Sequence, residues 1–291
     1  MMRVSAGFRG VGRATGGRRV RLGPRVLIGG AIIAALSLVA LLAPVIAPND
    51  PIAVDTSRLL QPPGPSAWLG TDDLGRDVFS RIVWGARVSL SVGFISVGIG
   101  LIVGVSLGMI SGYGAGWVDL LVMRVIDALL AFPPLLLALA ITAALGPQLQ
   151  NAMIAIGVLA VPVYARLARG QVLTIRHRDF ILAARAVGIP SVRILTRHIF
   201  PNIVNPLIVM ATLWAGFAIL TEASLSFLGL GIQPPQPSWG QDIAYSQRQI
   251  FLGRWWTVFG PGAAIFLAVI GFNMLGDGLR DAFDPRLRRS G

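Results

Sequence analysis

Six apolar stretches constrain the fold of this chain more than any other feature of its sequence. They cover residues 26–47, 89–112, 120–145, 151–167, 204–230 and 259–275. An α-helix rises about 1.5 Å per residue, so roughly 20 apolar residues cross the ~30 Å hydrocarbon core of a bilayer. Only 13% of the 291 residues are charged, whereas a soluble domain carries about a quarter. The sequence therefore predicts an all-α polytopic membrane protein with six transmembrane helices, the third kinked at Pro133 and Pro134.

The distribution of arginine predicts the orientation in the membrane. All 25 basic residues are Arg, and eighteen of them fall in residues 1–25, 166–197 and 280–291. Positively charged residues near transmembrane ends are retained on the cytoplasmic side. Both termini and the polar loop 176–202 are therefore predicted to be cytoplasmic.

Together these patterns divide the chain into five parts. They are a basic cytoplasmic tail (1–25), a first transmembrane helix (26–47), an extracytoplasmic segment (48–87), a transmembrane domain (88–280) and a second basic cytoplasmic tail (281–291).

Composition excludes several kinds of site. The chain has no Lys, and a phosphate-binding loop of the Walker A type needs one to reach the nucleotide. It has no Cys, and its two histidines lack companion metal ligands. The transmembrane stretches hold no catalytic constellation. We therefore expect no enzyme activity, no metal and no cofactor on this chain. The basic tail is expected to contact anionic lipid and not nucleic acid.

The loop 176–202 is predicted to form two short helices joined by a hinge. Asp179 is a candidate N-cap, and Phe180, Ala183 and Ala184 share one face at helical spacing. Gly188 can adopt the left-handed conformation that ends a helix.

A second helix is then predicted over residues 192–199, capped by Ser191 and ended before Pro201. Such a pair is too polar to span the membrane, and it is a candidate contact for a soluble partner.

Four stretches resemble one protein family. Residues 180–188 with 197–202 (Arg-His-Ile-Phe-Pro-Asn) are similar to the EAA loop of the permeases of bacterial ABC importers, and residues 68–81, 221–240 and 273–286 also resemble this family. The match is to binding-protein-dependent transport inner-membrane components, specifically the second (C-type) permease of the dipeptide/oligopeptide/nickel subfamily. The family has an acidic residue where this chain has Leu182.

The resemblance implies a function and partners. It implies a permease subunit of the bacterial cytoplasmic membrane that forms half of a pathway for dipeptides or oligopeptides. A second homologous permease, one or two cytoplasmic ATPase subunits that carry ATP and Mg, and an extracytoplasmic peptide-binding protein would complete the importer. The ATPase contact would use the set Asp179, Phe180, Ala183, Ala184, Arg185 and Gly188. Alternatives are a permease for nickel or another small solute, and a stand-alone secondary transporter.

Four further features carry expectations about the structure. Glu222 is the only Glu and falls within an apolar stretch, so it is a candidate translocation-pathway residue, with a structural hydrogen bond as the alternative.

Glycines recur every fourth residue from Gly100 to Gly112, which favours close helix packing. Residues 72–81 hold three Asp and two Arg, which predicts a surface turn held by ion pairs, with direct contact to substrate as the alternative. Trp239, Trp255 and Trp256 are expected in an interfacial aromatic belt.

Overall fold

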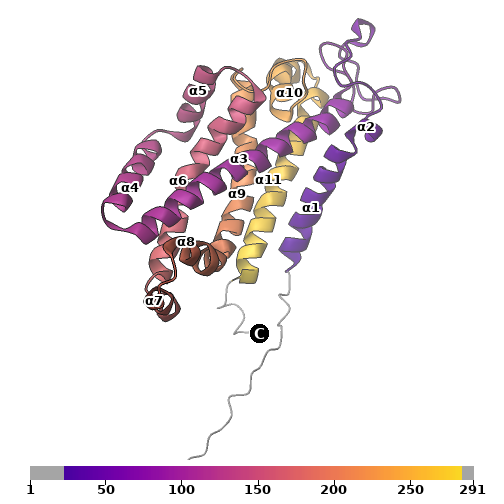
Figure 1. Cartoon of the computed structure of the whole chain (residues 1–291). Helices are drawn as coiled ribbons and strands as arrows, with labels where there is room; N and C mark the ends of the chain where they lie inside the picture. The colour runs from indigo at the N-terminus through magenta and orange to yellow at the C-terminus, as the bar shows by residue number, and fades with distance from the viewer. Residues whose placement is uncertain (1–22, 284–291) are drawn as a thin grey trace, which may run out of the picture.

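The computed structural model describes residues 23–283, and this part of the chain is a bundle of helices without a β-sheet (Figure 1). Five helices are long and apolar enough to cross a membrane, and a sixth crossing is made if one bent pair counts as a single span. The main helices are α1 (Pro24–Leu41), α3 (Val78–Gly114), α4 (Gly116–Leu130), α5 (Pro134–Leu145), α6 (Leu149–Ile175), α9 (Phe200–Phe227) and α11 (Trp256–Phe283). The prediction of a polytopic all-α membrane protein is confirmed. The tails 1–22 and 284–291 lie outside the described residues.

The third predicted span is not one kinked helix. Helices α4 and α5 meet at an angle of 92°. Pro133 has an extended backbone (φ −55°, ψ 128°), and Pro134 occupies the first position of α5. A proline has no amide proton and disfavours helical geometry in the residue before it, so the pair ends α4 and starts a new helix.

Helices α3, α6 and α11 extend well beyond their predicted spans. Helix α3 begins at Val78 because the carboxylate of Asp77 accepts a hydrogen bond from the Ser80 amide (2.9 Å) and caps it. Helix α6 continues to Ile175, although its predicted span ended at residue 167.

The glycines of α3 allow its backbone to touch α6, as predicted. A Cβ atom added at Gly104 would lie 2.6 Å from the carbonyl oxygen of Val161, and one at Gly108 would lie 2.3 Å from that of Ala165. A side chain at either position would therefore clash with the α6 backbone, and glycine allows the two helices to approach this closely.

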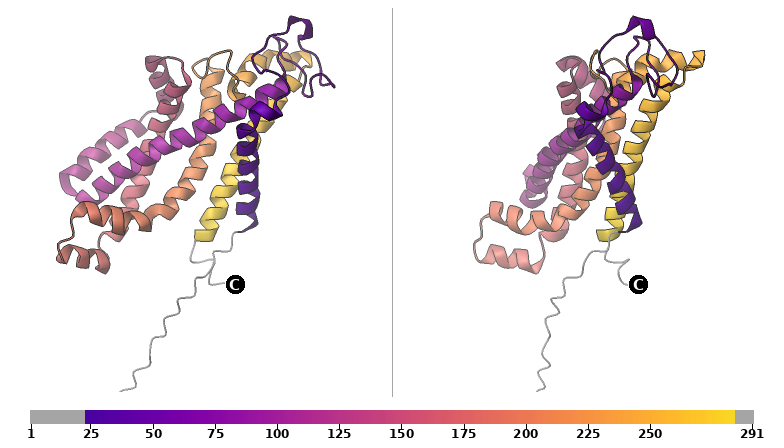
Figure 2. Two further views of the ribbon diagram at one scale, coloured as in Figure 1. Left: turned by 45° about the vertical axis from the view of Figure 1, so that its right-hand side comes forward. Right: turned by 90° about the vertical axis from the view of Figure 1, so that its right-hand side faces the viewer.

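Helices α1 and α11 form a second close pair (Figure 2). A Cβ atom at Gly29 of α1 would lie 2.5 Å from the Leu275 amide nitrogen, and one at Gly278 of α11 would lie 2.6 Å from the Val26 side chain. The described part of the chain therefore starts and ends side by side.

The two ends of the bundle differ in architecture (Figure 1). One end, called here the α7 end, carries α7 (Asp179–Ala186), α8 (Ser191–Arg193), the start of α1 and the end of α11. The other, the α10 end, carries α2 (Ala43–Ile46), residues 48–77 with the short helix η1 (Thr56–Arg58), α10 (Trp239–Ser246) and η3 (Gln247–Leu252). With α4 and α5 counted as one span, residues 23–283 form six candidate spans, which is an even number.

Candidate functional site

The hinge after α7 has the geometry that Gly188 predicts. Gly188 has φ +76°, and its amide bonds to the Arg185 carbonyl (3.0 Å). The Ile189 amide bonds to the Ala184 carbonyl (3.0 Å), which completes a Schellman motif. A Cβ atom at Gly188 would meet nothing within 4 Å, so only backbone conformation restricts this position.

The start of α7 differs from the prediction. Arg178 occupies the N-cap position without a side-chain cap bond, and Asp179 is the first residue of the helix. Asp179 therefore contributes its negative charge to the first turn, where it complements the helix dipole, and does not cap the amides.

The faces of α7 are also distributed differently. Its buried side chains are Ile181 and Ala184, which pack in the main hydrophobic core. Phe180 (41% exposed), Ala183 and Val187 (77% exposed) face outward. Of the six residues proposed for the ATPase contact, Ala184 is thus buried, and Asp179, Phe180, Ala183, Arg185 and Gly188 are exposed.

Two arginines attach this loop to the end of α3. The Arg185 guanidinium lies 4.6 Å from the ring centroid of Tyr113 and donates to its hydroxyl (3.2 Å). Arg176 donates to the Gly112 carbonyl oxygen (2.9 Å). Because guanidinium groups both stack on aromatic rings and donate several hydrogen bonds, the loop is held against the bundle.

The second short helix does not end before Pro201. Pro190, not Ser191, occupies the N-cap position of α8, and the chain continues through the π-helical turn η2 (Ile194–Ile199) into α9. Pro201 lies at the start of α9, directly after the π-helical turn, and does not end the helix. The hinge is therefore joined to a transmembrane helix without a break.

Helix α9 forms one wall of a large apolar groove. The groove has a volume of about 700 Å³ and lies between α3, α9, α11 and α1. Its lining is almost wholly apolar and includes Phe94 and Ile102 of α3, Phe200 and Ile208 of α9, and Phe272 of α11. Such a wall offers contact area without a strong binding site for one solute.

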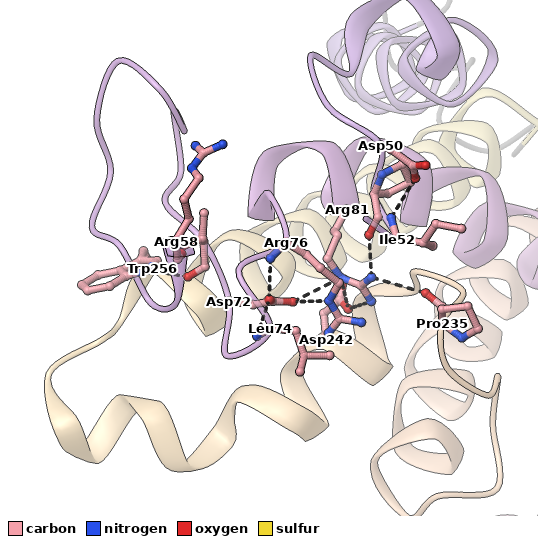
Figure 3. Close-up of polar contacts among 12 residues, drawn as sticks. Asp50, Ile52, Arg58, Asp72, Leu74, Arg76, Arg81, Pro235, Asp242 and Trp256 are labelled. Carbon is pink, nitrogen blue, oxygen red and sulfur yellow. Dashed lines mark hydrogen bonds and ion pairs between the residues drawn. The ribbon is translucent and has the colours of Figure 1, made fainter. Parts of the chain in front are cut away.

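A buried ion network holds the α10 end together (Figure 3). The Asp72 carboxylate accepts from Arg76 Nε (2.7 Å) and lies 3.9 Å from Arg81 Nε. Arg81 pairs with Asp242, with Nε at 2.9 Å, and donates to the Pro51 carbonyl oxygen (2.9 Å). Arg81 thus joins α3, residues 48–77 and α10.

This network corrects the prediction of a surface turn. Asp72, Arg76 and Arg81 are each less than 10% exposed. Burial raises the pKa of the Asp242 carboxyl, and the guanidinium of Arg81 opposes that shift. Charges removed from water in this way depend on their partners far more than charges on a surface.

The tryptophans also differ from the predicted belt. Trp239 is 1% exposed and donates from its indole to the Ile82 carbonyl oxygen (2.9 Å). Trp256 is partly buried and donates to the Thr71 carbonyl oxygen (3.2 Å). Trp255 alone of the three is exposed, at 55%.

Glu222 lies buried near the α10 end of α9 and does not line the groove. Its Oε1 accepts a hydrogen bond from the Ser226 hydroxyl (2.8 Å), and within residues 23–283 its Oε2 has no partner. A role for Glu222 in a translocation pathway stays a prediction.

Two parts of this arrangement were missed in the sequence. Arg81 and Asp242 are 161 residues apart, and the only available signal was the unusual density of charge in residues 72–81. The groove residues are apolar side chains within apolar spans, so no sequence signal separates them from residues that face lipid.

Comparison with family models matches two segments of the chain. Residues 104–289 match the binding-protein-dependent transport system inner membrane component. Residues 18–63 match the N-terminal TM domain of oligopeptide transport permease C.

Individual relatives cover most of the chain. The dipeptide transport system permease protein DppC of Alkalihalophilus pseudofirmus is 50% identical over 262 residues, which is 90% of this chain and 86% of that protein. The glutathione transport system permease protein GsiD of Pectobacterium atrosepticum is 44% identical (80% and 77% covered). The probable D,D-dipeptide transport system permease protein DdpC of Escherichia coli is 42% identical (90% and 88% covered).

Proposed function

The chain belongs to the family of binding-protein-dependent transport system inner membrane components, and we propose from this membership that it is the permease subunit of an ATP-driven peptide importer. The observation that carries the proposal is the 50% identity to a dipeptide permease over nine-tenths of the chain. The other named relatives transport a D,D-dipeptide and glutathione, which are also peptides. These names favour peptides over nickel, and they favour an importer subunit over a stand-alone secondary transporter.

The energy source must lie on other subunits. Without Lys the chain cannot build a Walker A loop, so ATP and Mg would be bound by one or two partner ATPases. A second, homologous permease and an extracytoplasmic peptide-binding protein would complete the importer. The chain itself supplies half of the pathway and has no cofactor of its own.

We further propose that the α7 end faces the cytoplasm and receives the ATPase. The arginine distribution supports this orientation. The exposed apolar side chains of Phe180, Leu182 and Val187 offer a contact that does not need the family's acidic residue.

The same helices offer a route for the movement. A displacement of α7 would pass across the hinge to α8, η2 and α9, because these last three segments form one continuous helix. Helix α9 would then move one wall of the apolar groove, which changes access to the pathway.

Substitution at Gly188 tests the coupling. We expect Gly188→Val to insert into the membrane but to abolish peptide-stimulated ATP hydrolysis by the reconstituted importer, because an L-residue loses about 1–2 kcal/mol in the left-handed conformation and displaces α7. The matched control is Gly253→Val, since Gly253 has φ +77° and equally open surroundings at the α10 end. Equal loss in both variants, or normal hydrolysis in Gly188→Val, would contradict the coupling role.

Purification tests the assembly itself. The affinity-tagged chain, extracted in mild detergent, is expected to retain a second permease and ATPase subunits, which mass spectrometry identifies. In proteoliposomes this complex with its binding protein should import a dipeptide only when ATP is enclosed on the ATPase side. Import by the chain alone under a proton gradient would refute the proposal.

A further inference from the structure

A second pocket, distinct from the apolar groove, opens at the α10 end. It has a volume of about 510 Å³ and lies between α2, the first residues of segment 48–77, the start of α3 and the loop before α10. Its walls include the rings of Pro48, Pro51 and Pro237 and the indole of Trp84. Pockets of about 300–1,000 Å³ with apolar and aromatic walls are typical of small-molecule sites.

The polar groups of this pocket are free to bind. Asn49 and Gln236 line it, and within residues 23–283 neither side-chain amide has a hydrogen-bond partner. The carboxylate of Asp50 also lines it and accepts one bond, from the Ile52 amide to Oδ1 (2.9 Å). In the described part of the chain Asp50 forms no ion pair, so its second oxygen is available to a cation.

An unpaired cation stands beside the same pocket. The guanidinium of Arg87 lies 5.1 Å from the ring centroid of Trp84, and Arg87 is exposed. No carboxylate among residues 23–283 forms an ion pair with Arg87. The pocket therefore has the Asp50 carboxylate in its lining, and the Arg87 guanidinium, which is not itself in the lining, stands against the indole that forms one wall. Neither group forms an ion pair within residues 23–283.

The pocket and the groove lie along one face of α3. Trp84, Ser91, Gly98 and Ile102 recur at intervals that place them on one side of a helix, and none of the four is buried. Trp84 lines the pocket and Ile102 lines the groove. The 18 residues between them correspond to about 27 Å of helix, so the exposed face connects the α10 end with the middle of the bundle.

We propose that this pocket is the permease's own subsite for the two charged ends of a short peptide. The Asp50 carboxylate receives the terminal ammonium, the Arg87 guanidinium receives the terminal carboxylate, and the peptide side chains contact Trp84 and the proline rings. The amides of Asn49 and Gln236 bond to the peptide group. A free dipeptide is a zwitterion and carries an ammonium and a carboxylate on one small molecule. An Asp and an Arg at one pocket, neither of them in an ion pair, complement these two charges. This inference rests on the proposed function and adds a binding site on the chain itself.

Alkylation of a single cysteine tests the subsite. The chain has no Cys, so Gln236→Cys supplies one reactive thiol at the pocket, and Ser66→Cys supplies an exposed control elsewhere in segment 48–77. The complex in nanodiscs is treated with a membrane-impermeant maleimide in the presence of alanylphenylalanine, its N-acetyl form or its C-terminal amide. We expect the free dipeptide to slow alkylation of the thiol at position 236 and not of the thiol at position 66. The concentration of free dipeptide that halves the alkylation rate should be at least fivefold lower than that of either blocked form.

Two charge variants sharpen the result. Asp50→Asn should remove the preference for a free ammonium, and Arg87→Gln should remove the preference for a free carboxylate. Asp73→Asn, a carboxyl change in the same segment outside the pocket, should behave as the parent. Equal half-protection by free and blocked peptides would overturn the subsite, and so would an Asp50→Asn variant indistinguishable from Asp73→Asn. Reaction of the thiol only with a membrane-soluble maleimide would show that lipid fills the pocket and would also overturn it.

The importer function has a separate readout. Peptide uptake by the reconstituted wild-type complex without protection at 236 would refute only the subsite. Protection without ATP-dependent uptake would support the subsite and refute only the importer function.

Discussion

Replacing Gly108 with Ala should separate helices α3 and α6. The added Cβ would lie 2.3 Å from the Ala165 carbonyl oxygen and 2.9 Å from the Ala168 Cβ. Ala165 and Ala168 are both fully buried, and their contacting atoms are backbone and Cβ atoms that no rotamer change can move. The helices must therefore move apart. Overpacking of this kind costs about 1–3 kcal/mol.

The matched control is Gly98→Ala in the same helix, where a Cβ would meet nothing within 4 Å. It should gain about 0.5–1 kcal/mol of helix stability, because Ala loses less backbone entropy on folding than Gly. For a chain of this size, 1 kcal/mol corresponds to about 2–4 °C in Tm, so Gly108→Ala should unfold about 2–12 °C below wild type.

Thermal unfolding of the purified proteins, followed by intrinsic tryptophan fluorescence in one detergent at one scan rate, measures both variants. A Tm for Gly108→Ala equal to that of Gly98→Ala would refute the close-packing argument. It would show that the α3–α6 contact tolerates a methyl group in place of direct backbone contact.

Three further predictions concern the network, the buried acid and the groove. Arg81→Met should lower the free energy of unfolding by about 3–5 kcal/mol, because it leaves Asp242 buried without its partner. The double variant Arg81→Met with Asp242→Leu should recover part of this loss, and thermal unfolding measures both variants. Glu222→Gln should leave peptide uptake coupled to ATP hydrolysis, because Glu222 does not line the groove. Loss of uptake with intact hydrolysis would instead place Glu222 on the translocation pathway. Spin labels at Ile102→Cys and Ile208→Cys, across the groove, should change their separation when ATP binds to the reconstituted complex, whereas a pair on the outer faces of α3 and α6 should not.

Sequence reasoning succeeded where one local property decided the structure. The four-residue spacing of glycines predicted a close helix contact, because helical geometry alone places them on one face, and the structure shows that α6 makes this contact. Gly188 predicted the end of α7, because a positive φ strongly favours glycine.

Sequence reasoning failed where distant elements decide the environment. Whether the charges in residues 72–81 are exposed depends on Asp242, which the fold brings to Arg81 from the other end of the chain. Trp239 matched the composition of an interfacial belt, but its indole bonds to a backbone carbonyl inside the bundle. Likewise, Pro133 and Pro134 predicted a disturbance of the helix, and packing determined that it became a 92° break.

The packing of the bundle indicates where a change of shape is least costly. Helices α3 and α6 meet through backbone contacts at glycine, and so do α1 and α11, which leaves neither pair room to slide. The apolar groove lies between these two pairs, and α9, continuous with the exposed α7 loop, forms its wall. Movement along this boundary exchanges apolar side-chain contacts for other apolar contacts and keeps both glycine-mediated helix contacts intact. A permease that opens by relative displacement of rigid parts should therefore open between α3 and α9.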